Sequence, residues 1–143
     1  MQKPNLKDNH LIEALLRANN LPVSDLNNGI TFFVEKTNDT VIATGGIESA
    51  GKDAIIRSIA VQDAYKGKGL GSKITRQLLK YARETGMRDV HLLTTTAENY
   101  FPRYDFKKIE RQSVPVDVKN SSQYKDVCPD SAVVMKLDLK HNK

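Results

Sequence analysis

Apolar residues recur at helical spacing near the start of the chain. Leu11, Ile12, Leu15 and Leu16 are adjacent or three to four residues apart, which gathers them on one side of an α-helix. We therefore predict an amphipathic helix over Asn9–Ala18 that packs through this side against the rest of the fold.

The next part of the chain alternates between runs of β-forming residues and polar turns. Ile30–Lys36 and Val41–Glu48 are rich in β-branched and aromatic residues, and turn residues around Asn38 separate them, which predicts a hairpin. A second turn, Ser49–Asp53, leads to a third strand, Ala54–Val61. Three consecutive strands without intervening helices argue against a parallel Rossmann sheet.

Helical spacing returns beyond residue 69. Ile74, Leu78, Leu79 and Ala82 again share one side of a helix, and Gly86 is suited to end it in the left-handed conformation. The strand predicted next, residues 89–96, should lie parallel to the third strand, because a helix connects the two. The remaining predicted elements are a short helix, a strand, a polar and partly helical segment and a last strand: Ala97–Tyr104, Lys107–Arg111, Val114–Asp130 and Ala132–Leu139.

Length and composition are those of a soluble globular domain. The chain has 143 residues, 39% of them apolar and 27% charged, so we expect residues 1–143 to form a single domain. No window approaches the apolar run of about 20 residues that crosses a bilayer, and the first residues lack a signal-peptide apolar region. The expected location is the cytoplasm, without membrane association.

The numbers of cysteines and histidines and the net charge bear on three classes of site: disulfides, metal sites and nucleic-acid-binding surfaces. Cys128 is the one cysteine, so no internal disulfide forms, and the three histidines are too scattered for a recognisable metal motif. No metal is expected. The net charge of +5 raises the alternative of nucleic-acid binding. The basic residues are spread along the chain without a nucleic-acid-binding motif, so a basic cleft for one polyanionic cofactor explains them at least as well.

A glycine-rich loop joins the third strand to the second helix and carries the main chemical signal. In the stretch Ile59–Lys73, an apolar run gives way to a basic loop in which Gly67, Gly69 and Gly71 occupy alternate positions. Backbone N–H groups at a helix start have no partner inside the helix, and the helix dipole adds positive charge there. The natural guest is an anion, most often a phosphate, which glycines allow to approach closely.

Two familiar phosphate loops do not match this stretch. A Walker loop needs four residues between its glycines and then Gly-Lys-Ser/Thr, whereas here Ser72 precedes Lys73. A dinucleotide fingerprint needs a third glycine three places after the second and an acidic residue at the end of the next strand, whereas Asp89 begins that strand. A plain glycine-rich turn with a solvated basic flank remains an alternative.

The motif Lys66-x-x-Gly69-x-Gly71 resembles the pyrophosphate-binding loop of the GNAT superfamily of acyl-CoA-dependent N-acetyltransferases, with Lys in place of the usual Gln or Arg. Ser58–Val61 looks like the strand that leads into this loop, and Tyr100–Phe106 like the family's later aromatic motif. The resemblance implies an α/β (α+β) fold with a mixed, mostly antiparallel central sheet of six to seven strands flanked by helices. Its elements run in family order over most of the chain.

A narrower resemblance concerns the acceptor. Leu92–Glu98, Ile56–Ser58 and the segment Cys128-Pro129-x-Ser131-Ala132 look like the small arsenic-resistance N-acetyltransferases. The first two segments also look like bacterial amino-acid N-acetyltransferases that act on glutamate-like substrates.

The resemblance implies that acetyl-CoA is the cosubstrate and indicates which residues hold it. Its pyrophosphate would be bound by backbone amides of the loop, and its pantetheine arm would pair with the exposed edge of the third strand, where the N–H of Val61 can polarise the thioester carbonyl. The implied cofactor-binding residues are Ile59, Ala60, Val61, Lys66, Gly67, Lys68, Gly69, Leu70, Gly71 and Ser72.

Candidates for proton transfer and acceptor binding follow from the same comparison. Glu48 is the candidate general base or, alternatively, a surface glutamate before a turn. Tyr100 and Tyr104 are the candidate acids, because Phe101 occupies the place where the family often has tyrosine; alternatively, they are plain core or surface aromatics. Arg57, together with the adjacent Ser58, is predicted to bind an anionic group of the acceptor, since guanidinium forks onto carboxylates and similar oxyanions. Alternatively, Arg57 points to solvent and pairs with an acid, Glu48 being one such partner.

These observations predict an acetyl-CoA-dependent N-acetyltransferase acting on the amino group of a small molecule, either an amino acid or an amino-acid-like toxin with an anionic group. A non-catalytic acyl-CoA-binding regulatory module is the alternative. The expected partner is a small-molecule amine; nucleic acid and membrane are not expected, and a homodimer is left open.

Overall fold

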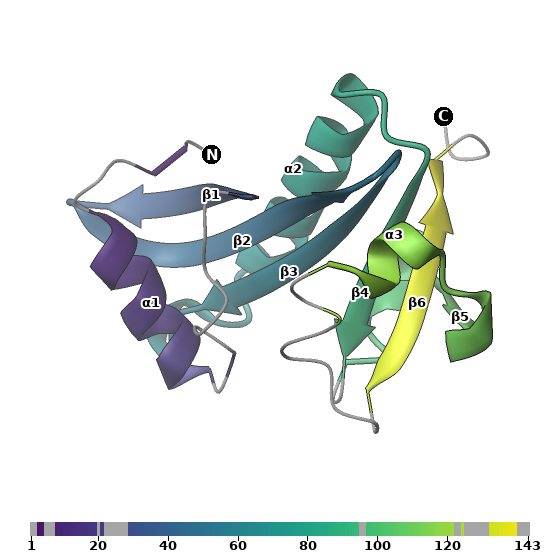
Figure 1. Ribbon diagram of the computed structural model, residues 1–143. Helices are drawn as coiled ribbons and strands as arrows, with labels where there is room; N and C mark the ends of the chain where they lie inside the picture. The colour runs from purple at the N-terminus through teal and green to yellow at the C-terminus, as the bar shows by residue number, and fades with distance from the viewer. Residues whose placement is uncertain are drawn as a thin grey trace.

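One mixed sheet organises the molecule (Figure 1). The computed structural model describes residues 3–4, 8–19, 21, 29–94, 97–121, 124 and 132–139. Its sheet has six strands in the order β1-β2-β3-β4-β6-β5. The strands are β1 Ile30–Thr37, β2 Thr40–Ala50, β3 Asp53–Val61, β4 Asp89–Thr94, β5 Lys107–Ile109 and β6 Val133–Asp138. The pairing of β3 with β4 is parallel and the others are antiparallel, which confirms the predicted fold class.

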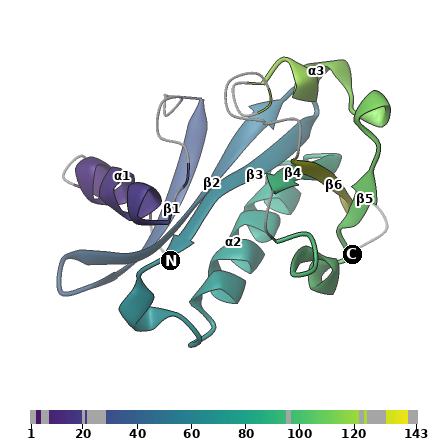
Figure 2. The same ribbon diagram turned by 90° about the horizontal axis from the view of Figure 1, so that it is seen from below.

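Helices cover both faces of the sheet. The α-helices are α1 Asn9–Ala18, α2 Leu70–Glu84 and α3 Val116–Lys119, and the 3₁₀ turns are η2 Asp63–Tyr65, η3 Phe101–Tyr104 and η4 Arg111–Ser113. Seen along the sheet, α1 and α3 lie on one side and α2 on the other (Figure 2). No described helix is long and apolar enough to cross a membrane.

Three apolar clusters fix these helices in place. The largest lies between α2 and the sheet, where Ile74 and Leu78 are fully buried with Ile56 and Phe106. A second cluster joins α1 to the ends of β1, β2 and β3, and a third joins α3 to Ile55 and its neighbours. Burial of an aliphatic side chain stabilises the fold by about 1.5–3 kcal/mol, so these clusters hold the loops that surround the sheet.

The predicted elements agree with the structure with small shifts at their ends. The first helix is confirmed with its bounds, and Gly86 follows α2 at φ 77° as expected for a left-handed cap. The turn predicted over residues 49–53 is too long, because β2 continues to Ala50 and β3 begins at Asp53. Of the short helix predicted from Ala97, the structure has a 3₁₀ turn over Phe101–Tyr104.

Some predictions concern residues outside the described part of the chain. These are the last two residues of the predicted strand, Thr95 and Thr96, the segment Cys128–Ser131 and most of the polar stretch beyond residue 121. The described part of that stretch contains α3, which agrees with its predicted partial helicity.

A β-bulge interrupts the pairing of β2 and β3. Arg57 lies opposite Gly46, and the next recorded pair joins Ala60 to Thr44, so β3 carries one residue more than β2 between the two pairs. Ser58 lies in this interval with φ 57°, in the left-handed region that non-glycine residues seldom adopt. A bulge of this kind re-aims the side chains that follow it.

The bulge determines which face of the sheet each later side chain of β3 reaches. Ile56 packs in the cluster under α2, as do Ile59 and Val61, whereas Ile55 packs toward α3 and Ala60 toward α1. Strict alternation from Ile56 would place Ser58 in the α2 cluster and Val61 on the other face. The extra residue therefore keeps the apolar side chains in the core.

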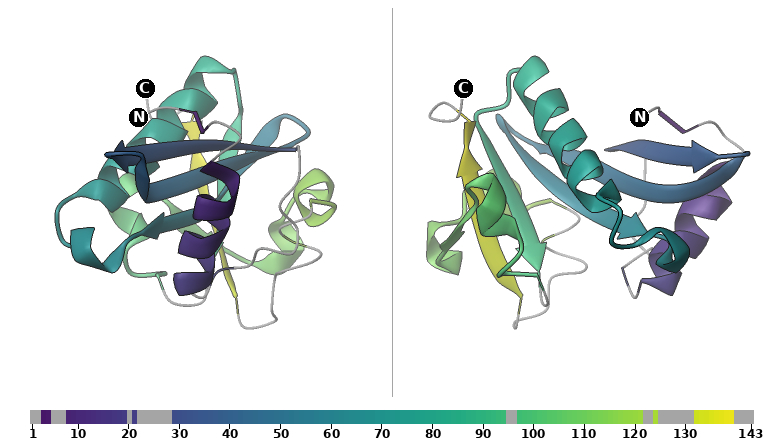
Figure 3. Two further views of the ribbon diagram at one scale, coloured as in Figure 1. Left: turned by 90° about the vertical axis from the view of Figure 1, so that its left-hand side faces the viewer. Right: turned by 180° about the vertical axis from the view of Figure 1, so that it is seen from behind.

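The sheet opens between its two parallel strands. Pairing of β3 with β4 is confined to Ala54 with Val90 and Ile55 with His91. Beyond these pairs the strands diverge, so that β1–β3 and β4–β6 form the two arms of a V (Figure 1). Figure 3 gives the same arrangement from the side and from behind, with α2 in front of the sheet in the right-hand view. The functional candidates gather in this opening.

Candidate active site

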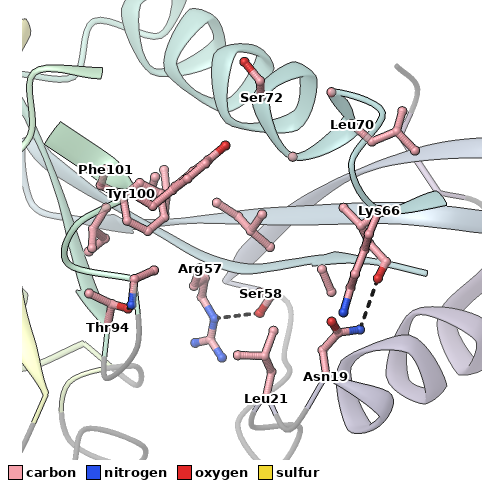
Figure 4. A pocket seen from close by; sticks show the side chains of 18 of the residues that line it. Asn19, Leu21, Arg57, Ser58, Lys66, Leu70, Ser72, Thr94, Tyr100 and Phe101 are labelled. Atoms are coloured by element: carbon pink, nitrogen blue, oxygen red, sulfur yellow. Dashed lines mark hydrogen bonds between the residues drawn. The ribbon is translucent and has the colours of Figure 1, made fainter. Parts of the chain in front are cut away.

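A cleft of about 630 Å³ fills the opening between β3 and β4. The predicted cofactor residues that line it are Ile59–Val61, Lys66, Gly67 and Gly69–Ser72. Arg57, Ser58 and Tyr100 line it as well (Figure 4). The fold therefore brings residues from the loop, the strand and the later aromatic segment to one place, although they are far apart in the sequence.

The glycine loop is open toward this cleft at the start of α2. Gly67 and Gly69 have φ values of 78° and 85°, and Gly69 is the N-cap residue of α2. A Cβ atom added to either glycine would meet no described heavy atom within 4 Å. The first amides of a helix are free of intrahelical partners, so the loop combines accessible donors with space for a phosphate group, and the residues present fit the pyrophosphate of CoA.

The loop cations surround this space but are already engaged. The Lys66 ammonium lies 2.8 Å from the Asp63 carboxylate, and the Lys73 ammonium lies 2.6 Å from that of Glu35. The Lys68 ammonium lies 5.7 Å from the centre of the Tyr65 ring, and Lys68 does not belong to the lining of the cleft. The contact of Lys68 with the cofactor therefore stays a prediction from the sequence. The accessible donors for a phosphate are the backbone amides of the loop.

The backbone of β3 faces the opening at Val61. Val61 lies opposite Ala43, and the neighbouring Gln62 N–H donates a 2.8 Å hydrogen bond to the carbonyl of Ile42. In an antiparallel ladder this pattern marks Val61 as a position whose own N–H and C=O point away from the partner strand. They point toward the side on which β4 diverges, so the Val61 N–H is directed at a ligand in the cleft.

Arg57 and Glu48 form an ion pair on the α1 and α3 side of the sheet. The Arg57 Nη1 donates to Glu48 Oε1 at 3.2 Å, with side chains 1% and 10% exposed. Arg57 Nε also donates to the Ser58 hydroxyl at 3.3 Å. The alternative in which Arg57 points to solvent and pairs with an acid is right about the pairing with Glu48 but wrong about the solvent, because Arg57 is buried beside the cleft (Figure 4). Glu48 is absent from the described lining and belongs to β2, which neighbours β3 on the side away from β4.

Tyr100 projects toward the start of α2 on the opposite side of β3 from the Arg57 guanidinium (Figure 4). Its hydroxyl lies 3.6 Å from where a Cβ of Gly71 would be and 2.6 Å from the Tyr104 hydroxyl. Burial raises the pKa of Tyr100 to about 12, with a further contribution from the hydrogen bond to Tyr104 and opposition from the charges of Arg103 and Arg76. The Tyr100 phenol is therefore protonated at neutral pH.

Tyr104 supports Tyr100 without lining the described part of the cleft. The two rings meet edge to face with centroids 5.5 Å apart, and Tyr100 and Phe101 do so at 5.2 Å. The Arg103 guanidinium lies 4.2 Å above the Tyr100 ring, and its Nε donates to the Tyr100 carbonyl at 2.9 Å. This cluster holds Tyr100 in one orientation.

Sequence reasoning missed several lining residues. Asn19 donates from Nδ2 to the carbonyls of Leu15, at 3.0 Å, and Val61, at 3.5 Å, and so links the end of α1 to the end of β3. Leu21 and Arg103 also line the cleft. Asn19 has a signal in the sequence, since Asn is common where helices end, but its contact with Val61 depends on how α1 packs.

A second polar cluster lies at the closed end of the opening, where β3 and β4 begin. His91 Nε2 lies 3.2 Å from Asp53 Oδ2, and Arg88 Nε donates to Asp53 Oδ1 at 3.1 Å. Asp53, Asp89 and His91 bring ligand-type atoms within 4.8 Å of one another. Asp53 is already shared between two side chains, so this cluster serves as an internal network that ties β3 to β4.

Comparisons with known proteins agree with this geometry. A model of the acetyltransferase (GNAT) family matches residues 5–104. An amino-acid acetyltransferase of Mycobacterium tuberculosis is 34% identical over 90 residues, which is 62% of this chain and 48% of that protein. The matched part of the chain thus spans about half the length of that relative.

Solved structures share the fold. Rv2747 of Mycobacterium tuberculosis, crystallised with CoA, has a TM-score of 0.77 at 22% identity and covers 96% of this chain and 97% of its own. N-acetylglutamate synthase of Neisseria gonorrhoeae, crystallised with coenzyme A and N-acetyl-glutamate, has a TM-score of 0.77 at 14% identity. That match covers 97% of this chain and 34% of the synthase. At such identities the likeness concerns the fold.

Proposed function

Because the chain belongs to the acetyltransferase (GNAT) family, whose acetyl donor is acetyl-CoA, we propose that it acetylates the amino group of a small molecule bearing a carboxylate or a similar oxyanion. The observation that supports this most is the continuous cleft from the glycine loop to Arg57. A ligand in it would have phosphate donors at one end and a buried guanidinium at the other.

Acetyl-CoA supplies an acetyl thioester; the amine nitrogen bonds to its carbonyl carbon, the carbon–sulfur bond breaks, the amine loses a proton and the thiolate gains one. The Val61 N–H is the group that would donate to the carbonyl oxygen as negative charge develops on it. The amides of residues 67–72 would bind the pyrophosphate. In this arrangement the protein contributes mainly by positioning the two substrates and by polarising the thioester carbonyl.

The acceptor side is assigned to Arg57 and Ser58. The Arg57 guanidinium is held by Glu48 and Ser58, so its direction is fixed before the acceptor arrives. A preorganised guanidinium recognises carboxylate by paired charge-assisted hydrogen bonds. The relative named as an amino-acid acetyltransferase supports an amino acid as the acceptor class.

The residues proposed for proton transfer are chosen by their contacts and their burial. Glu48 is the proposed base, acting through water, because its carboxylate contacts Arg57 and does not itself line the described cleft. Tyr100, supported by Tyr104, is the proposed donor toward the thiolate. A thiol titrates near pH 8.5 and Tyr100 at about 12, so complete proton transfer from Tyr100 is uphill. Tyr100 would therefore act chiefly by donating a hydrogen bond, and its loss should cost about tenfold in rate.

A non-catalytic acyl-CoA-binding module is the alternative, favoured by Phe101 at the family's tyrosine position and by the absence of Glu48 from the described lining. Release of free thiol from acetyl-CoA, measured over a panel of amino acids, their carboxamides and phosphonate or arsenical analogues, separates the two. The enzyme should release thiol with the anionic amines. Stabilisation by CoA in a thermal shift without turnover on any amine would favour the module.

A further inference from the structure

A basic groove runs along the outer side of α2 and begins where the cleft ends. It is lined by Gly69, Ser72, Lys73, Arg76, Gln77 and Lys80 and has a volume of about 420 Å³. Gly69 and Ser72 line the main cleft too, so the two spaces meet at the start of the helix. In Figure 3, right, no described element covers this side of α2.

Helical spacing explains why these side chains form one surface. Lys73, Arg76 and Lys80 are separated by three and four residues, which aligns them along one face. Side chains on a helix lean toward its N-terminus, so Arg76, whose Cα is about 10 Å along the axis from Gly69 at 1.5 Å per residue, extends back toward the loop. The face therefore directs positive charge at the helix start.

Two of these cations differ from Lys66 and Lys73, because they have no acidic partner among the described residues. Lys73 is paired with Glu35 at 2.6 Å. Within the described part of the chain, neither the Arg76 guanidinium nor the Lys80 ammonium forms an ion pair. Arg76 also lies close enough to the cleft for its charge to oppose the larger effect of burial on the pKa of Tyr100. An anion in the groove between Arg76 and Lys80 would give both cations a partner.

We propose that this groove binds the ribose 3′-phosphate of CoA, with Arg76 as the main contact and Lys80 as the second. The inference rests on the proposed function, because the pyrophosphate must occupy the loop for the ribose to reach α2. The ligand is a phosphomonoester, which brings up to two negative charges to exposed cations. Each exposed ion pair contributes up to about fivefold in affinity, so the 3′-phosphate should improve binding about tenfold.

The test compares CoA with 3′-dephospho-CoA, which keeps the pyrophosphate, the pantetheine arm and the thiol. Dissociation constants of both ligands are measured by titration calorimetry for the wild type, Arg76→Ala and Arg76→Ala/Lys80→Ala. Arg83→Ala is the matched control, because Arg83 is an exposed cation of α2 outside the groove. Because the two ligands differ only in the 3′-phosphate, the ratio of their dissociation constants measures the contribution of that phosphate to affinity.

The wild type and Arg83→Ala should favour CoA about tenfold at 0.1 M salt, and the preference should shrink at 0.5 M. It should fall to about twofold in Arg76→Ala and disappear in the double variant, with dephospho-CoA binding unchanged. A double variant that keeps the wild-type ratio, or that loses both ligands equally, overturns the assignment. So does a wild type that does not distinguish the two ligands.

Other outcomes separate this inference from its premise. If neither CoA nor dephospho-CoA binds the wild type, the proposed function itself fails and takes the groove assignment with it. If the variants lose affinity for a single-stranded oligonucleotide while the ratio of the two CoA constants stays at the wild-type value, the groove serves a nucleic acid and the assignment to CoA is wrong.

Discussion

Arg57 allows the sharpest test of the acceptor assignment. We expect the guanidinium to bind an acceptor carboxylate through two parallel hydrogen bonds. Arg57→Lys keeps the positive charge but cannot form this paired contact. The contact would form in a desolvated setting, since the Arg57 side chain is 1% exposed. A hydrogen bond to a charged group in a protein contributes about 1.5–3 kcal/mol, which corresponds to a loss of about 10- to 150-fold in kcat/KM for an anionic acceptor.

The ion pair with Glu48 has to be separated from this effect. Removing the charge by Arg57→Met leaves the 10% exposed Glu48 carboxylate without the guanidinium it accepts from, and breaking a buried pair from one side costs about 3–5 kcal/mol in stability. The double variant Arg57→Met/Glu48→Gln removes both charges and should recover most of this loss. Urea unfolding of Arg57→Met and of the double variant, each compared with the wild type, measures the recovery.

The assay compares each acceptor with its own carboxamide. Values of kcat/KM are measured for the best amino acid of the panel and for the amide in which the carboxylate is replaced. The wild type should prefer the acid, and the preference should fall about 10- to 150-fold in Arg57→Lys and in the double variant. CoA affinity should stay within about twofold in both, since Arg57 lies across β3 from the loop side.

The pattern of losses decides the outcome. If acid and amide lose activity equally in Arg57→Lys, Arg57 supports the fold and does not read the acceptor. Glu48→Gln adds a separate measurement: a fall in kcat that high pH restores indicates a base, whereas a rise in KM for the acid alone indicates that Glu48 positions Arg57.

Three further predictions concern the loop, the donor and the closed end of the sheet. Gly69→Asp should abolish CoA binding in calorimetry, whereas Gly86→Asp, which has a similar left-handed conformation and open space at the other end of α2, should cost stability alone; equal CoA affinity in the two variants would contradict the loop assignment. Tyr100→Phe should lower kcat about tenfold with unchanged KM for acetyl-CoA, and a full-rate variant would rule out its role. Burial lowers the pKa of His91 despite its hydrogen bond to Asp53, so its contribution to stability is present above about pH 6.5 and is lost as the pH falls below it. The free energy of unfolding should therefore drop by up to about 1.4 kcal/mol per pH unit there, and His91→Gln should flatten this slope in urea titrations at pH 5, 6 and 7; a wild-type slope in the variant would contradict the explanation.

Local patterns were sufficient to predict most of the secondary structure. The helix over Asn9–Ala18 was predictable because its apolar positions share one face, and the left-handed cap at Gly86 was predictable because glycine favours that conformation; its φ is 77°. The glycine loop was recognisable because a strand, alternate glycines and a helix start follow each other directly. In each case the decisive residues are close together in the sequence.

Contacts between distant segments were not predictable in the same way. The hydrogen bond from Asn19 to Val61 and the hydroxyl contact of Tyr100 with Tyr104 depend on how α1 and η3 pack. The extra residue at Ser58 was also missed, because a bulge has no fixed sequence signature beyond an irregular alternation. Only the pairing with β2 identifies it.

The bulge links the fold to the chemistry. Before it, Arg57 faces the α1 and α3 side with Ile55; after it, Ile59 and Val61 face α2, on the side of the loop and Tyr100. One strand therefore presents a cation to one face of the opening and a backbone edge to the gap, while its apolar side chains stay buried. The left-handed conformation of Ser58 costs about 1–2 kcal/mol. Such a conformation persists where the packing around it stabilises it. A regular β3 would turn Val61 and Arg57 to the same face, so the donor side and the acceptor side would no longer be separated by the sheet.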